Sequence, residues 1–189
     1  MADFGSFLPL SQRSSGSESD VSSDRRAAVA DIVEQAAQRV TAAALSGERR
    51  DTAALIEAFI DAAQLRAEAA AHPGGSPGAL DAIAAAVRTG KRRSVRALAS
   101  ACRALLQLAE AVDSPAELPP DIAGAVALYL AGAGPFDRRA AVKGHTVRAT
   151  DADWSFGRGP LLEAPATQIA AFLLGTSDEP PRPPRVTGG

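Results

Sequence analysis

The strongest constraint on the fold is a regular spacing of apolar residues between positions 95 and 112. Apolar side chains recur there at intervals of three and four, which matches the repeat of an α-helix. The residues in this pattern are Val95, Leu98, Ala99, Cys102, Leu105, Leu106, Ala109 and Val112. The spacing predicts a helix over about 93–112 with one apolar stripe, and such a stripe must pack against other elements.

The same periodicity predicts four further helices, which clusters of Gly and Pro separate. They are a helix capped by Ser23 or Asp24 and ended by Gly47, and helices over about 51–71, 78–88 and 121–131. Hydrophobic residues make up 46% of the chain but aromatic residues only 4%, so Ala, Leu and Val must form the core. Because Ala is small and favours helices, the sequence predicts a mainly α fold with an Ala-rich bundle of about five helices over residues 24–134.

The pattern changes after Pro135. Residues 141–150 include the strand formers Val142, Thr146 and Val147, and a second extended segment begins at Trp154 after a turn rich in Asp. A second turn, Arg158-Gly-Pro, leads to a helix expected over 166–174. Residues 135–176 are therefore predicted to form a β-hairpin and a short terminal helix, a small α+β appendage to the bundle.

The two ends of the chain lack helical or strand patterns. Residues 1–23 are rich in Ser and charge, which predicts a disordered tail, although Phe4, Phe7, Leu8 and Leu10 form a short apolar patch within it. Residues 177–189 are rich in Pro and are expected to form an extended tail.

Composition narrows the functional classes. The 20 basic and 22 acidic residues give a formal charge of -2, which argues against a dedicated nucleic-acid binder. Cys102 is the only cysteine, so no disulfide can form within the chain. The first ten residues lack the features of a secretory signal, and no apolar run is long enough to span a membrane. The default expectation is a cytoplasmic protein.

One stretch resembles a known family. Residues 144–160 read GHTVRATDADWSFGRGP, and an apolar helix ending in Gly175 follows. This order of strand, Trp, glycine turn, Gly-Pro and Leu-x-Gly resembles the C-terminal part of actinobacterial mycothiol-dependent maleylpyruvate isomerase-like proteins. The resemblance covers about residues 117–175, roughly a third of the chain.

The resemblance implies a DinB-like metal-binding helical bundle joined to a small α/β domain with a sterol-carrier-like layout. It also implies thiol-dependent chemistry on a metal held by the bundle. A histidine-based metal site needs about three ligands on facing helices. His72 lies in a Pro/Gly breaker and His145 in the predicted strand, so no predicted bundle helix carries a His. No cofactor is therefore predicted, and mycothiol or a divalent metal is expected only if the family chemistry is retained.

Four residues of the hairpin are candidates for catalysis. They are His145, Arg148, Asp151 and Asp153. If these side chains converge, they could hold a metal or act in acid–base chemistry. The favoured alternative is an Asx-type turn at Thr150 and Asp151, with the other side chains facing water.

Two further groups are candidates for binding a ligand or partner. Trp154 and Phe156 share one strand face, which favours a core contact with the last helix, and the alternative is an exposed binding surface that includes Trp154 and Arg158. Lys91, Arg92 and Arg93 form a basic cluster near a helix start, where positive charge opposes the helix dipole. This cluster could bind an anion, pair with nearby acidic residues or, as we favour, remain solvated.

Three functional hypotheses follow. The leading one is a non-catalytic binding or interaction protein that takes a partner protein or a small apolar ligand between the bundle and the hairpin. The second is a small thiol-dependent isomerase or transferase that uses His145, Arg148 and the Asp pair. The third is a helical regulator that contacts nucleic acid through residues 88–96.

Cys102 lies on the apolar stripe and is expected to be buried and inert. The sequence leaves a homodimer open.

Overall fold

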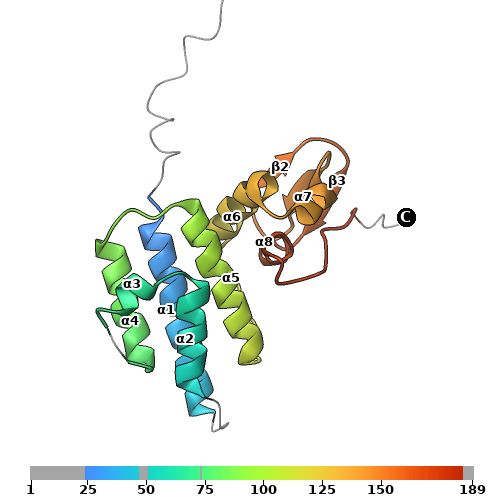
Figure 1. The fold of residues 1–189 in the computed structure, drawn as a ribbon. Coiled ribbons are helices and arrows are strands. Elements are labelled where there is room, and N and C mark those ends of the chain that lie inside the picture. Colours follow the sequence, from blue (N-terminus) through green and yellow to red (C-terminus); the bar gives the residue numbers. More distant parts are fainter. Residues whose placement is uncertain (1–23, 47–50, 73, 185–189) are drawn as a thin grey trace, which may run out of the picture.

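Helices dominate the computed structural model, which describes residues 24–46, 51–72 and 74–184 (Figure 1). A small sheet follows the main helices, so the prediction of a mainly α fold with a small α+β appendage is confirmed. The predicted tail over 1–23 and the helix end at Gly47 lie outside the described residues. None of the described helices is long and apolar enough to cross a membrane.

The first group of helices, here called the helical bundle, covers residues 24–112. Its elements are α1 (Arg26–Leu45), α2 (Thr52–Ala62), α3 (Arg66–Ala69), α4 (Pro77–Thr89) and α5 (Val95–Ala111). α1 packs against α4 and α5, and α2 packs against α5. The stripe that predicted α5 is buried over most of its length, including Leu98, Cys102 and Leu105, each of which is fully shielded from solvent.

Side-chain caps fix the ends of several bundle helices. The Ser94 hydroxyl accepts a hydrogen bond from the Ala97 N–H at the start of α5. At the start of α1, the Asp24 carboxylate accepts hydrogen bonds from the Arg26 and Arg93 N–H groups. The predicted cap at Asp24 is wrong, because Arg25 occupies the cap position, but the Asp24 carboxylate still accepts from the N–H of the first helical residue. Asp24 also ties α1 to the segment between α4 and α5.

The single helix predicted over 51–71 is wrong, because the chain leaves α2 at Ala63 and begins α3 at Arg66. Gln64 adopts a left-handed conformation with φ of 59°, and the Leu65 N–H donates to the Ile60 carbonyl oxygen at 3.0 Å. This pattern is a Schellman motif, in which a left-handed residue ends the helix and the next side chain packs against it. Leu65 is buried, which accounts for the break, whereas Ala67 in α3 is exposed.

The second group, here called the C-terminal unit, covers residues 118–184. Its elements are α6 (Pro120–Ala133), α7 (Phe136–Val142), β1 (Thr146–Ala149), β2 (Ser155–Gly157), β3 (Leu161–Ala164) and α8 (Ala166–Leu174). α6 packs mainly against α8 and less against α5. α6 therefore belongs with the sheet in space, as Figure 1 shows, whereas the sequence predicts it as the last helix of the bundle.

The predicted hairpin is present as β1 and β2, which pair antiparallel with Val147 opposite Phe156. Two elements of this unit were not predicted. The first is β3, which pairs parallel to β1 on its other side, so that the strand order is β2-β1-β3. The second is α7, a short helix that contains Val142, which was predicted in a strand. The predicted terminal helix is confirmed as α8.

The connection from β2 to β3 explains the Gly-Arg-Gly-Pro sequence at 157–160. β3 must run parallel to β1, so this short connection crosses the start of β1. Gly157 and Gly159 have φ values of 84° and 127°. A Cβ at Gly157 would lie 2.2 Å from the His145 carbonyl oxygen, and one at Gly159 would lie 2.0 Å from that of Gly144. Only glycine fits such a crossing, because it tolerates positive φ and has no side chain.

The start of the predicted Pro-rich tail is bound to the sheet. Residues 177–184 contain no helix, and Arg182 forms an isolated antiparallel bridge with Glu163 of β3. The Glu163 N–H donates to the Arg182 carbonyl oxygen at 2.7 Å, and the reverse bond measures 3.1 Å. This bridge protects the β3 edge of the sheet, whereas β2 forms the other edge.

Candidate ligand-binding surface

Two hollows open where α6 and α7 face the hairpin, and both are lined by Phe156. The first, here called the α6 hollow, has a volume of about 530 Å³ and lies between α6 and β2. The second, here called the α7 hollow, has a volume of about 410 Å³ and lies between α7 and the Gly157–Arg158 turn. Because Phe156 lines both hollows, we treat them together as one surface of the C-terminal unit.

Trp154 is held in the wall of the α6 hollow by α6 itself. Its indole Nε1 donates a hydrogen bond to the Pro120 carbonyl oxygen at 2.9 Å. The indole also lies directly over Gly124, where an added Cβ would approach its ring atoms to 3.1 Å. The ring stacks on Phe156 with a centroid separation of 6.2 Å and an interplanar angle of 15°.

The interactions of Trp154 described above are with α6 and Phe156, so the predicted contact with the last helix stays a prediction. Phe156 shares a sheet face with Val147 and Leu162, which are buried. β2 is an edge strand, and at this edge Trp154 reaches α6. Trp154 and Phe156 are half-buried. Each ring packs on the core, as one prediction expected, and also lines an open hollow, as the alternative of a binding surface expected.

Exposed apolar side chains gather at these hollows. Among the described residues, the large hydrophobic side chains that are exposed are Leu45, Leu128 and Phe136. Leu128 lines the α6 hollow and is 62% exposed, and Phe136 lines the α7 hollow and is 79% exposed. Single exposed apolar residues are ordinary on protein surfaces, but a contiguous group around a hollow is typical of a binding surface.

The sequence reasoning missed both of these residues, although one signal was present. Leu128 falls outside the predicted apolar stripe of its helix, which used Ile122, Val126, Tyr129 and Leu130. A large apolar residue off the stripe of an amphipathic helix faces solvent unless something else covers it. Phe136 gave no such signal, because α7 was not predicted.

Basic residue types line the α7 hollow, three of them Arg or Lys. Arg139, Lys143, His145 and Arg158 line it, and none of its lining residues is Asp or Glu. Arg139 donates one hydrogen bond to the Gly132 carbonyl oxygen at 3.2 Å, while its buried Nε has no partner within the described part of the chain. The α6 hollow differs in charge, since Asp121 and Asp153 line it.

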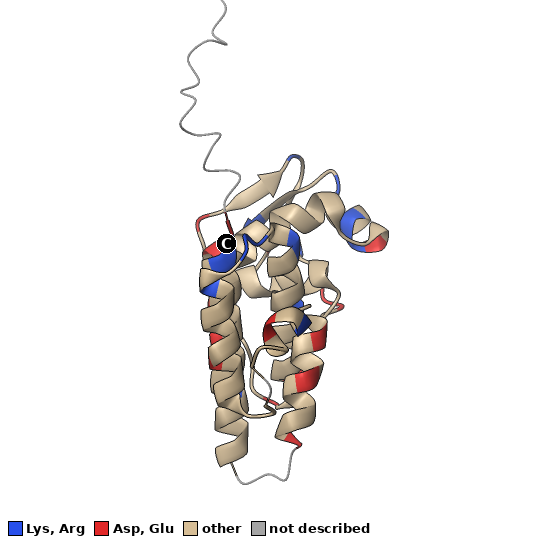
Figure 2. Ribbon diagram, turned by 60° about the vertical axis from the view of Figure 1, so that its left-hand side comes forward, with Lys and Arg blue, Asp and Glu red and all other residues tan. Residues whose placement is uncertain are grey.

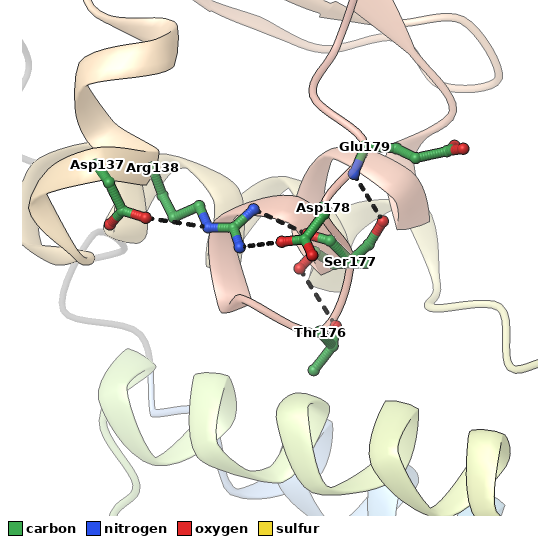
Figure 3. Close-up of polar contacts among 7 residues, drawn as sticks. Asp137, Arg138, Thr176, Ser177, Asp178 and Glu179 are labelled. Atoms are coloured by element: carbon green, nitrogen blue, oxygen red, sulfur yellow. Dashed lines mark hydrogen bonds and ion pairs between the residues drawn. The ribbon is translucent and has the colours of Figure 1, made fainter.

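Arg138 holds α7 against the rest of the C-terminal unit (Figure 3). Its guanidinium lies 4.8 Å from the centre of the Phe172 ring in α8. It donates to the Ser177 carbonyl oxygen at 2.9 Å and forms ion pairs with Asp178 and Asp137. Both carboxylates are largely exposed, so the ring contact and the backbone hydrogen bond fix this wall of the α7 hollow more than the ion pairs do.

The four candidate catalytic residues do not converge. His145 lines the α7 hollow and Asp153 lines the α6 hollow. Arg148 pairs with Glu163 of β3 at 2.7 Å. The Asp151 carboxylate accepts a hydrogen bond from the Ala166 N–H at 2.7 Å and so caps the start of α8. No group of three or more His, Cys, Asp or Glu residues in 24–46, 51–72 and 74–184 is placed to hold a metal ion.

Two arginines at the basic cluster, Arg93 within it and Arg88 just before it, pair with acidic neighbours. Arg88 forms ion pairs with Glu34 and Asp31 of α1, and these hydrogen bonds raise its pKa. Arg93 pairs with Glu68 of α3. Pairing with nearby acidic residues, one of the alternatives from the sequence, therefore applies to these two arginines.

The remaining members of the cluster, Lys91 and Arg92, are exposed and have no ion pair with a described residue. Figure 2 shows that the bundle helices carry both signs of charge.

The Cys102 thiol is buried in α5, and burial raises its pKa to about 12. A thiol in this state is not a nucleophile at neutral pH.

Comparisons of the chain with protein-family models, curated proteins and solved structures gave no match. The resemblance of residues 117–175 to maleylpyruvate isomerase-like proteins therefore stays a prediction.

Proposed function

We propose that this chain is a non-catalytic binding protein that holds a small ligand with an apolar body on the surface formed by α6, α7 and β2. The observation that carries the proposal is the grouping of exposed Leu128 and Phe136 with half-buried Trp154 and Phe156 around two adjoining hollows. Within the described residues, this group holds two of the three exposed large hydrophobic side chains.

The size of the hollows supports a small ligand over a protein partner. Small-molecule sites have volumes of about 300–1,000 Å³ and are lined mainly by apolar and aromatic side chains. The two hollows, at about 410 and 530 Å³, lie within this range. Their walls are also held in place, since Trp154 is bonded to α6 and Arg138 anchors α7.

We take the family resemblance as a sign of common ancestry and not of shared activity. In that reading, α6, the sheet and α8 descend from the small α/β domain of maleylpyruvate isomerase-like proteins, and the thiol chemistry of the bundle has been lost. The proposal does not depend on this ancestry, because the hollows and the side chains around them carry it alone.

The test uses N-phenyl-1-naphthylamine, an uncharged apolar dye whose fluorescence rises when it leaves water. We expect saturable binding to the full chain, and we expect the double variant Leu128→Ser/Phe136→Ser to weaken it at least about tenfold, because about 1.4 kcal/mol corresponds to that factor. Leu45→Ser is the matched control, since Leu45 is 82% exposed and lines neither hollow.

Two results would overturn the proposal. One is an absence of saturable dye binding to the folded wild-type chain. The other is an equal loss of affinity in the Leu45→Ser control, which would place the dye on apolar surface in general.

A further inference from the structure

We propose that the ligand is an amphipathic organic anion, and that the α7 hollow binds its anionic group next to its apolar body. This inference rests on the proposed function and specifies the class of ligand. Its basis is a set of four basic side chains around an apolar floor, without a carboxylate among the lining residues.

The basic residues of the α7 hollow differ from the arginines around them in their pairing. Arg138, on the same helix, reaches Asp178, and Arg148, on β1, reaches Glu163. Lys143, Arg158 and Arg139 have no ion pair with any described residue, and the Arg139 guanidinium donates to the Gly132 carbonyl oxygen. The chain therefore neutralises neighbouring cations internally and leaves those of the hollow available to an external anion.

Backbone geometry brings these cations together from distant positions in the sequence. Arg158 lies between Gly157 and Gly159, whose positive φ angles carry the chain across the start of β1. The crossing places Arg158 at the same hollow as Lys143, which directly follows α7. His145 lies on the segment that is crossed, with its Nδ1 at 3.2 Å from the Lys143 carbonyl oxygen.

The floor of the same hollow is apolar. Phe136, Val142 and Phe156 line it, and Phe156 leads on to the α6 hollow and Trp154. A ligand with a charged end and an apolar body therefore matches the α7 hollow in both properties. An anion without an apolar body would use only the rim, where exposed ion pairs contribute little in water.

Two dyes that share an apolar anilinonaphthalene skeleton test the inference. 8-Anilinonaphthalene-1-sulfonate carries a sulfonate, and N-phenyl-1-naphthylamine does not. We expect the double variant Lys143→Gln/Arg158→Gln to weaken binding of the sulfonate dye about fivefold or more, and to change binding of the neutral dye less than about twofold. Added salt should weaken binding of the sulfonate dye alone.

The matched control is Lys91→Gln/Arg92→Gln, which removes the same two charges from an exposed site that lines neither hollow. It should leave the affinity for both dyes unchanged. All four substituted side chains are exposed, so thermal melting should show that the variants fold, and Lys143→Gln alone provides a milder second variant.

The outcomes separate this inference from the proposed function. If the neutral dye binds but the Lys143→Gln/Arg158→Gln variant keeps its affinity for the sulfonate dye, the assignment of an anion is wrong and the apolar site stands. An equal loss of affinity for the sulfonate dye in the Lys91→Gln/Arg92→Gln control would also overturn the assignment of an anion, since the change in net charge would then account for the weaker binding. If neither dye binds, both proposals fail.

Discussion

The helical bundle and the C-terminal unit treat their apolar and charged side chains differently. The bundle buries the stripe of α5 completely at Leu98 and Leu105, and its partly buried cation Arg93 has an acidic partner in Glu68. The C-terminal unit exposes Leu128 and Phe136 beside two hollows, whereas the exposed Leu45 of the bundle is the last residue of α1 and lines neither hollow. This difference in the surroundings of the exposed side chains is the basis of our proposal that the C-terminal unit, and not the bundle, binds a ligand.

The largest effect on stability should come from truncating a side chain in the bundle core. Leu105→Ala removes a fully buried side chain, so we expect the free energy of unfolding to fall by about 2–5 kcal/mol. Phe136→Ala removes a larger side chain that is 79% exposed, and should change the free energy of unfolding by no more than about 0.5 kcal/mol. Urea unfolding measures both. A similar loss in the two variants would show that Phe136 belongs to a core.

The next effect concerns the crossing that shapes the α7 hollow. Gly159→Ala should destabilise the chain by about 1–3 kcal/mol, because φ is 127° there and the new Cβ would clash with the Gly144 carbonyl oxygen. Gly78→Ala in α4 is the control, since a Cβ there would lie 3.9 Å from the Ser76 Oγ, an ordinary contact, and Gly78 lines neither hollow. Thermal unfolding and dye binding should both respond to the first change, and a Gly159→Ala chain as stable as the control would contradict the crossing.

A smaller effect separates the structural and catalytic readings of the Asp pair. Asp151→Ala removes the cap of α8 and should cost about 0.5–2 kcal/mol of stability. Asp153→Ala should be within about 0.5 kcal/mol of the wild type, because its carboxylate has no hydrogen bond to a described residue. Denaturant titration distinguishes them. Equal effects on stability would argue against the capping role of Asp151.

The smallest effect lies at the start of α1. Burial favours the neutral form of Asp24, but hydrogen bonds from the Arg93 and Arg26 N–H groups and the Arg26 guanidinium outweigh it and lower its pKa. A lowered pKa stabilises the fold at pH values above the unfolded-state pKa, and this contribution is lost as the pH falls through the folded-state pKa. The stability difference between the wild type and Asp24→Asn should therefore shrink in acid below pH 3.8, the ordinary value for Asp. A difference that is independent of pH would contradict this assignment.

Sequence periodicity predicted the bundle well because each helix buries a stripe that repeats every three to four residues. It failed where a single residue decides the structure. Gln64 ends α2 in a conformation that favours Gly, and the buried Leu65 that justifies the turn is visible only in three dimensions. α7 was missed because it is too short to show a repeat, and its anchor, Arg138, depends on Phe172 and the segment after α8.

The candidate surface was predictable only in part. Trp154 and Arg158 were named from the sequence, and both line the hollows, but Phe136, Arg139 and Lys143 were not. These three residues lie on or next to α7, whose position against the turn depends on the parallel pairing of β3 with β1. No local pattern encodes that pairing, because β3 is four residues long and follows directly after a proline.

The most direct test of the contrast between the two regions is a backbone amide NMR titration of the full chain with decanoate, an amphipathic carboxylate. Saturable shifts should be confined to the C-terminal unit and centred on Leu128, Phe136, Lys143 and residues 154–158, with α1–α5 unaffected. Shifts spread through the bundle helices, or no shifts at concentrations below the solubility limit of decanoate, would contradict the assignment of binding to this surface.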